Sequence, residues 1–146
     1  RNGDAMKALL LLALIADARV VTLEVRLVAP CTSHTAGRPM KDPDGAGSIC
    51  LDRTPFLATR DVESAEVHHT SAGHPVVFLV FHSEAAMREL QVTMKNIGGR
   101  VGIVLNGRLV SAPKIPGGSR FLFIDAGFTQ AQAEGIVDAF NTQARR

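Results

Sequence analysis

The two cysteines of the chain, Cys31 and Cys50, are the residues to which the most specific chemistry can be assigned. An exported protein with one possible partner for each cysteine is expected to form a disulfide. The bridge would close a loop of about 20 residues and stabilise the fold by roughly 3 kcal/mol. Two free buried thiols in a cytosolic protein, or a lipid anchor on Cys31, are the alternatives. Pro30 disfavours the anchor, because it stands where a small residue is expected.

The histidines and carboxylates form no recognisable catalytic or metal-binding pattern. His68, His69 and His74 are clustered, but neighbouring residues of a strand face opposite sides, so His68 and His69 cannot easily bind one ion. The spacings of zinc motifs and the Gly-x-Ser-x-Gly motif of serine hydrolases do not occur. Paired carboxylates such as Glu63 and Glu66 are ordinary solvated residues by default. We therefore expect no catalytic residue, no metal, no cofactor and no enzymatic activity.

The charge pattern argues against nucleic acid as a partner. Sixteen Lys and Arg against fourteen Asp and Glu leave a net charge of +2, which is spread along the chain and not gathered into a basic block. Tyr and Trp are absent, which disfavours a base-stacking surface, and most of the seven phenylalanines are expected in the core. The 146 residues, 46% of them hydrophobic, fit one globular domain.

An apolar run near the start of the sequence predicts export. Residues 8–16 follow Lys7, and the run leads into the small-x-small sequence Ala16-Asp17-Ala18, as in a signal peptide. The run is shorter than the roughly 20 residues of a membrane span, so we expect no transmembrane span in the mature chain. A buried N-terminal helix is the alternative. The expected location is periplasmic or otherwise exported, including association with a membrane.

Hydrophobic periodicity predicts three strands and two helices besides the hairpin described below. Residues 20–28 alternate as a half-buried strand, 75–81 form a continuous apolar run expected to be a central strand covered on both faces, and 120–124 form a further strand. Residues 30–47 are predicted to be a surface loop. Residues 61–66 are either one helical turn or a loop that leads into a strand at 67–69.

The two predicted helices carry capping signals. Ser83 is the expected N-cap of a helix over residues 84–97, and Thr129 with Gln132 forms the capping box of a helix over residues 129–143. Apolar residues at helical spacing define the expected buried faces. They are Met87, Leu90, Met94 and Ile97 in the first helix, and Ala133, Ile136, Val137 and Phe140 in the second.

Residues 98–113 carry the strongest local signal, a β-hairpin. Two apolar runs flank Asn106 and Gly107, a pair that accepts positive φ at both turn positions. Basic side chains on or beside this hairpin could form a positive rim, although the alternative is that they are ordinary surface charges. The candidate partner-binding residues are Arg100, Asn106, Arg108, Lys114 and Arg120.

The second half of the chain resembles the head subdomain of the first periplasmic domain of SecD, an auxiliary subunit of the bacterial Sec protein-export machine. The resemblance runs from about Gly73 to Asn141. It is carried by four groups: an apolar strand before a helix with Thr93 and Asn96; Gly99 with the strand Val-Gly-Ile-Val-Leu; Asn106-Gly107 running to Ser111-Ala112-Pro113; and Gly127-Phe128-Thr129 with Ala133 and Glu134.

We predict an α+β domain, with a mostly antiparallel sheet and two helices packed on one face, like a ferredoxin-like head. The predicted organisation is a signal peptide with upstream residues over 1–18, an N-terminal strand and disulfide-closed loop region over 19–72, and the head-like core over 73–146. The resemblance implies a non-enzymatic exported module that binds polypeptide or a protein of the translocon or envelope. The alternative is an envelope small-ligand sensor or enzyme that uses a pocket between helix and sheet. The oligomeric state is not indicated.

Overall fold

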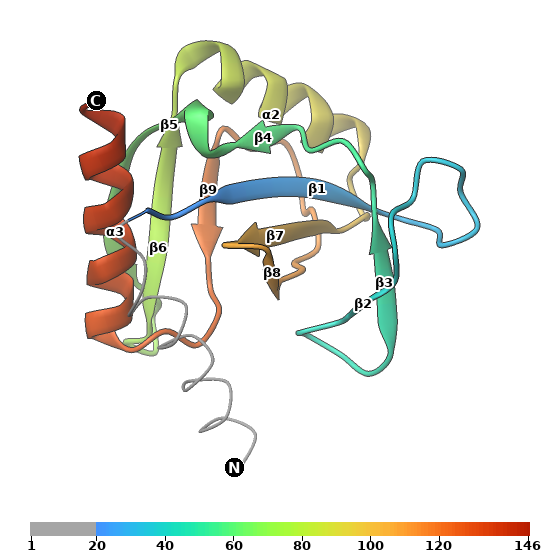
Figure 1. The fold of residues 1–146 in the computed structure, drawn as a ribbon, viewed down its shortest axis with the longest axis horizontal. Helices are drawn as coiled ribbons and strands as arrows, with labels where there is room; N and C mark the ends of the chain where they lie inside the picture. Colours follow the sequence, from blue (N-terminus) through green and yellow to red (C-terminus); the bar gives the residue numbers. More distant parts are fainter. Residues whose placement is uncertain (1–19) are drawn as a thin grey trace.

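The computed structural model describes residues 20–146, so the predicted signal peptide at residues 1–18 lies outside the described residues. The elements in the described range, labelled as in Figure 1, are β1 (Leu23–Ala29), β2 (Met40–Lys41), β3 (Ser48–Leu51), β4 (Leu57–Ala58), the short 3-10 helix η1 (Thr59–Asp61), β5 (Val62–His69), β6 (Pro75–Phe81), α2 (Ser83–Lys95), β7 (Val101–Leu105), β8 (Arg108–Ser111), β9 (Phe121–Ile124) and α3 (Gln130–Ala144). Within this range no helix is long and apolar enough to cross a membrane.

The strands form two sheets, and the pairs are antiparallel throughout. The first sheet has the order β2-β3-β1-β7-β8, with β4 also paired to β1, and the second has the order β5-β6-β9. This confirms the α+β class, but the sequence predicted a single sheet. Both edges of β6 are occupied by β5 and β9, so β1 pairs instead with β7 of the hairpin. The ferredoxin-like arrangement is not confirmed.

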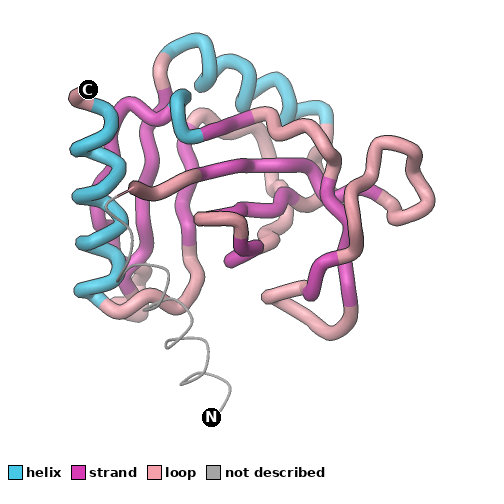
Figure 2. The backbone as a smooth tube through the Cα atoms, in the orientation of Figure 1, coloured by secondary structure: helices cyan, strands magenta, loops and turns pink. Residues whose placement is uncertain are grey.

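The two helices lie along different sides of the strands. Figure 1 shows α3 standing beside β5 and β6, whereas α2 runs along the top of the same view. Figure 2 shows the first sheet and its long connections extending to the side away from α3. A single hydrophobic core joins both sheets and α3, with Leu23, Ile103, Leu79 and Phe140 among its most deeply buried side chains.

The predictions for β1 and for the hairpin are confirmed. Leu23 and Val25 are each 1% exposed, whereas Glu24 and Arg26 face the other side of the sheet. In the hairpin, φ is 48° at Asn106 and 79° at Gly107, so both turn positions have the positive φ that the Asn-Gly pair favours.

The central strand β6 is fully covered on only one face. Val77 and Leu79 are inaccessible to solvent, but Phe78 and Val80 on the opposite face are half-buried. Phe78 lies against His68 of β5 and against Phe121 and Phe123 of β9, with ring centroids 4.4 to 5.5 Å away. Phe121 and Phe123 are 49% and 53% exposed, so the expectation that the strand phenylalanines are core residues is wrong for these two.

The orientation of α2 differs from the prediction. The helix buries Ala85, Glu89 and Thr93, and it exposes Met87 and Met94, which are 45% and 60% accessible. Ile97, predicted to be on the buried face, lies beyond the end of α2 and is 60% accessible. The N-cap is also different, because His82 occupies it without a side-chain hydrogen bond. Small side chains at positions 85 and 93 let this face approach its neighbours more closely than a methionine stripe would allow.

The prediction for α3 is confirmed in detail. The Thr129 hydroxyl accepts a hydrogen bond from the Gln132 amide, and the Gln132 side chain accepts one from the Thr129 amide. The predicted face, with Ala133, Ile136, Val137 and Phe140, is buried. Near the other end, the Asn141 side chain bonds both the amide and the carbonyl of Ala65, which fixes the helix against β5.

The region predicted as a surface loop is closed by the Cys31–Cys50 disulfide, which the structure confirms with an S–S distance of 2.08 Å. The loop is less irregular than predicted, because Met40 and Lys41 form β2 and pair with β3. An isolated antiparallel β-bridge also pairs the backbones of Ala36 and Asp52. Such pairing depends on residues that are distant in the sequence, so local composition did not indicate it. The β5 strand is likewise longer than predicted.

Candidate functional site

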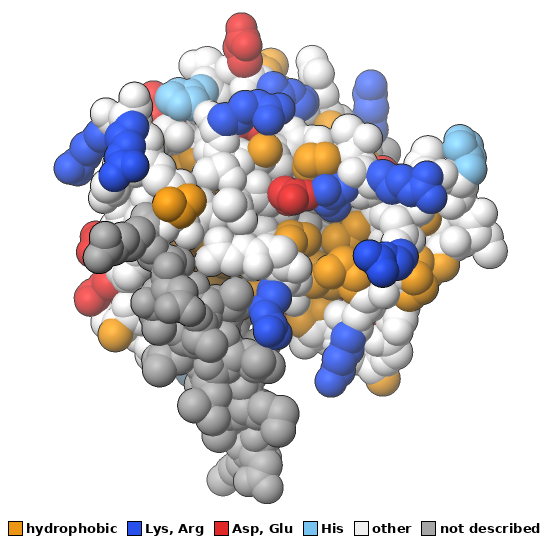
Figure 3. Space-filling model, in the orientation of Figure 1, with side chains coloured by type: hydrophobic (Ala, Val, Ile, Leu, Met, Phe, Trp, Pro, Cys, Tyr) orange, Lys and Arg blue, Asp and Glu red, His pale blue; other side chains and the backbone are white. Residues whose placement is uncertain are grey.

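An open groove crosses the face of the first sheet that carries Glu24 and Arg26. Its volume is about 560 Å³. Val104 of β7 and Leu51 of β3 form the apolar floor, and the segment from Gly37 to Met40 forms one wall. The space-filling view in Figure 3 shows an apolar patch on this side of the molecule with basic side chains around it. We call this feature the outer groove.

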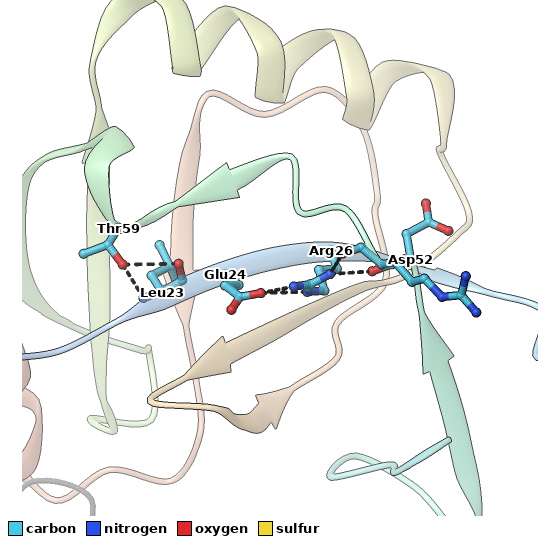
Figure 4. Close-up of polar contacts among 6 residues, drawn as sticks. Leu23, Glu24, Arg26, Asp52 and Thr59 are labelled. Atoms are coloured by element: carbon cyan, nitrogen blue, oxygen red, sulfur yellow. Dashed lines mark hydrogen bonds and ion pairs between the residues drawn. The ribbon is translucent and has the colours of Figure 1, made fainter. Parts of the chain in front are cut away.

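The acidic and basic residues at the floor of the outer groove neutralise one another. Because Glu24 and Arg26 are two residues apart on β1, their side chains lie on the same face of the sheet. The Arg26 Nε atom donates to Glu24 Oε2 at 2.9 Å, and its Nη1 atom donates to the carbonyl of Asp52 at 2.9 Å and to that of Arg53 (Figure 4). Arg26 therefore attaches the segment after β3 to β1 and has little capacity left for a ligand.

Thr59 fixes the start of β1. Its hydroxyl accepts a hydrogen bond from the Leu23 amide at 2.8 Å and donates to the Leu23 carbonyl at 3.4 Å, as Figure 4 shows. Since Leu23 is buried in the core, this contact holds η1 against the strand. The groove floor is thus built on a strand that side-chain hydrogen bonds fix at its start and at its middle.

Arg38 and Arg53 carry the available positive charge of the outer groove. Both line it, both are exposed, and within residues 20–146 neither side chain has a hydrogen bond or an ion pair. The nearby Asp52 carboxylate accepts a hydrogen bond from Thr35 at 3.1 Å and offsets part of this charge. The groove therefore presents an apolar floor with a weakly positive rim.

The predicted partner-binding residues do not form one surface. Arg108 is exposed next to the hairpin turn, whereas Arg100 and Lys114 pair as a β-bridge at the opposite end of the hairpin. Arg120 is exposed just before β9. The Asn106 side chain accepts a hydrogen bond from the Thr22 amide at 2.7 Å, so it attaches the turn to the start of β1. A binding role for this set remains a prediction.

Arg100 has a structural role. Its Nη1 and Nη2 atoms each lie 2.9 Å from a carboxylate oxygen of Asp42, and its Nε atom donates to the Ala112 carbonyl at 2.8 Å. Asp44 accepts a hydrogen bond from the Ala112 amide at 2.6 Å. These bonds connect the loop after β2 to the hairpin. The hydrogen bonds from Arg100 also hold the pKa of Asp42 below its ordinary value.

We expect Arg100→Gln to weaken the stability of the fold at neutral pH more than at acid pH. A lowered folded-state pKa stabilises the fold above the unfolded-state value of about 3.8, and this contribution is lost as the pH falls through the lowered pKa. Urea midpoints measured from pH 7 down to pH 2.5 test this. The gap between variant and wild type should narrow on acidification, and Arg108→Gln serves as the exposed control. A gap that is constant over this range would contradict the assignment.

Two of the clustered histidines, His68 and His69, take part in local contacts. His68 lies 2.9 Å from Glu66 and stacks on Phe78, and His69 contacts Gln130 at 2.8 Å. In the part of the chain that the structure describes, no group of three or more His, Cys, Asp or Glu residues is placed to hold a metal ion.

Sequence reasoning did not find the outer groove. Arg38 and Arg53 are near opposite ends of the segment closed by the Ala36–Asp52 bridge, and neither belongs to a recognisable motif. The alternation of Glu24 and Arg26 against Leu23 and Val25 was the available signal, since it showed that one face of β1 is polar. It did not show which residues lie above that face.

Comparison with known proteins identifies the family. Residues 33–141 match the family model of the SecDF P1 head subdomain, so the chain belongs to this family. The match begins well before Gly73, where the resemblance in the sequence starts, and it includes Leu51 and the segment from Gly37 to Met40, which line the outer groove.

The relatives are longer proteins. Over 87 residues the chain is 29% identical to protein translocase subunit SecD of Acidaminococcus fermentans. The aligned region covers 52% of this chain and 21% of that protein. Over 61 residues it is 41% identical to protein translocase subunit SecDF of Thermus thermophilus, covering 42% and 8%. A crystal structure of SecDF in a super-membrane-facing form has a TM-score of 0.66 at 25% identity, and the match covers 97% of this chain and 21% of that one. The chain thus spans about a fifth or less of these proteins.

Proposed function

We propose that this chain is a non-enzymatic head domain of the protein-export machinery, in the periplasm or another exported compartment, and that it binds extended polypeptide in the outer groove. The observation that carries the proposal is the match of residues 33–141 to the SecDF P1 head subdomain. Relatives in this family are protein translocase subunits. A domain that meets many exported chains needs a surface that tolerates different sequences.

The outer groove has the properties that such a surface requires. It is open and apolar at Val104 and Leu51, so it can cover hydrophobic side chains without a shape-specific pocket. Arg38 and Arg53 at its rim attract acidic residues of the bound chain. Exposed ion pairs contribute only about 0 to 1 kcal/mol each, so they bias the choice of segment without making binding tight. Weak, broad binding suits a polypeptide that must be released again.

We predict that the groove prefers acidic apolar peptides to basic ones. Two fluorescein-labelled peptides of one apolar sequence, interrupted by Glu in the first and by Lys in the second, provide the probes. Fluorescence anisotropy of the wild-type domain should show several-fold tighter binding of the Glu peptide at low salt, and added salt should reduce the difference. The double variant Arg38→Glu/Arg53→Glu should lose or reverse the preference.

Arg60→Glu is the matched control, because Arg60 is an exposed arginine of η1 that does not line the outer groove. It should leave the preference of the wild type unchanged. The proposal fails if the wild type binds the Lys peptide as tightly as the Glu peptide, or if Arg60→Glu changes the preference as much as the double variant does.

A further inference from the structure

A second cavity of about 510 Å³ lies between α2 and the segment from Pro113 to Phe123. Apolar side chains dominate its wall, and they come from both sheets and the connections between them. They are Val25, Phe56, Val101, Ile115, Pro116 and Leu122. Glu89 and Thr93 of α2 add two polar side chains. The volume lies in the range of natural small-molecule sites, which typically combine an apolar wall with a few polar groups.

Glu89 is the unusual member of this wall. Glu89 is only 2% exposed, and its Oε1 atom is buried with no hydrogen-bond partner among the described residues. A buried polar atom without a partner costs free energy, and such an atom in a native fold calls for an explanation, such as an absent ligand or ion. The carboxyl group is therefore the feature of this cavity that a ligand would satisfy.

The packing of α2 places Glu89 there. A Cβ atom at Gly118 would lie 2.7 Å from Met94 Cγ and 2.9 Å from Leu90 Cδ1, so the glycine lets these two side chains lie directly on the loop before β9. Leu90 is half-buried in this contact, and Glu89, the residue before it, is buried. The Glu89 carboxyl is therefore buried on a helix that packs closely against the loop before β9.

The neighbouring hydroxyl of Thr93 is already used. It donates to the Glu89 carbonyl at 2.8 Å and accepts a hydrogen bond from the Ser119 amide at 2.9 Å. Burial raises the pKa of Glu89 to about 8, although the Ser119 side chain opposes part of this rise. At neutral pH the carboxyl group thus holds its proton until a positive partner is present.

We propose that this cavity binds a small apolar amine, whose ammonium group pairs with the Glu89 carboxylate. The apolar body of the ligand would occupy the space beside Phe56 and Ile115, and the ammonium would supply hydrogen-bond donors to Oε1. On binding an ammonium ion, Glu89 releases its proton to solvent, which balances the charge. Lys114 is the other ionisable residue of the wall; it is exposed and repels a cation weakly. The site is separate from the outer groove and does not depend on the proposed function.

Benzylamine, benzyl alcohol and benzoate provide the test, because they share one apolar body and differ in the polar group. Isothermal titration calorimetry of the described domain at pH 7 should show one site. Benzylamine should bind about tenfold more tightly than benzyl alcohol, since a hydrogen bond between charged partners is stronger than a neutral one. Benzoate should bind most weakly. Glu89→Gln should abolish the preference for the amine and retain the alcohol, whereas Glu84→Gln, on an exposed position of the same helix, should behave as wild type.

A second measurement keeps the test valid if Glu89→Gln does not fold. Titrations of the wild type in two buffers of different ionisation enthalpy report proton release, and benzylamine should release close to one proton at pH 7, whereas benzyl alcohol should release none. The proposal is overturned if none of the three compounds binds, if benzoate binds as well as benzylamine, if a folded Glu89→Gln keeps the amine preference, or if no proton is released.

Discussion

Glu89→Leu is expected to raise the free energy of unfolding at neutral pH and to remove most of its decline toward alkaline pH. The folded-state pKa of about 8 lies above the unfolded-state value of 4.5, so the folded protein keeps a proton that the unfolded chain releases. The contribution of the Glu89 carboxyl group to the free energy of unfolding is therefore most favourable below about pH 4.5, and it is lost as the pH rises to about 8. The slope between these values is at most about 1.4 kcal/mol per pH unit.

Urea midpoints at pH 5, 7 and 8.5 measure this effect. Leucine has a volume similar to glutamate and leaves no unsatisfied buried oxygen, so the variant should gain most over wild type at pH 8.5 and least at pH 5. Glu84→Gln provides the exposed control and should follow the wild type. Parallel pH profiles for wild type and Glu89→Leu would show that the carboxyl group is not buried as described.

Loss of the disulfide is the second large effect that we expect. The Cys31–Cys50 bridge has a sequence separation of 19, and removing it should lower the free energy of unfolding by about 3 kcal/mol, mainly because the unfolded chain gains freedom. The double variant Cys31→Ala/Cys50→Ala measured against the oxidised wild type in urea tests this. Reduced wild type should resemble the double variant, and equal midpoints for oxidised and reduced protein would contradict the prediction.

The disulfide also bears on the outer groove. It closes the segment that contains Arg38, and Cys50 itself is only 1% exposed next to Leu51 of the groove floor. The reduced protein should therefore lose the preference for acidic peptides before it loses the core, since α3 and β6 are held by contacts elsewhere. Peptide anisotropy at a urea concentration below the main transition would detect this order of events.

Local signals predicted the elements whose geometry is decided by neighbouring residues. The Asn106–Gly107 turn, the alternation of β1 and the capping box at Thr129 depend on contacts within a few residues, and each is found as expected. The buried face of α3 was also predictable, because its apolar stripe has no competitor on that helix.

The predictions failed where a distant contact decided between two alternatives. On α2 the apolar stripe through Met87 and Met94 suggested one buried face, but the helix buries Glu89 and Thr93 instead, and the Thr93 hydroxyl accepts a hydrogen bond from the distant Ser119 amide. Likewise, the division into two sheets follows from the pairing of β9 with β6, which are separated by a helix and a hairpin. The candidate grooves depend on these long-range contacts, so the sequence did not indicate them.

The hydrogen bonds between Gln143 and Val21 bring the two ends of the described fold together. The Gln143 side chain accepts from the Val21 amide at 2.6 Å and donates to the Val21 carbonyl at 2.9 Å. The polypeptide therefore enters and leaves the domain at one corner. Such a unit suits insertion into a host protein through two adjacent connections, and a circular permutant opened at the turn after His69 should retain the same core.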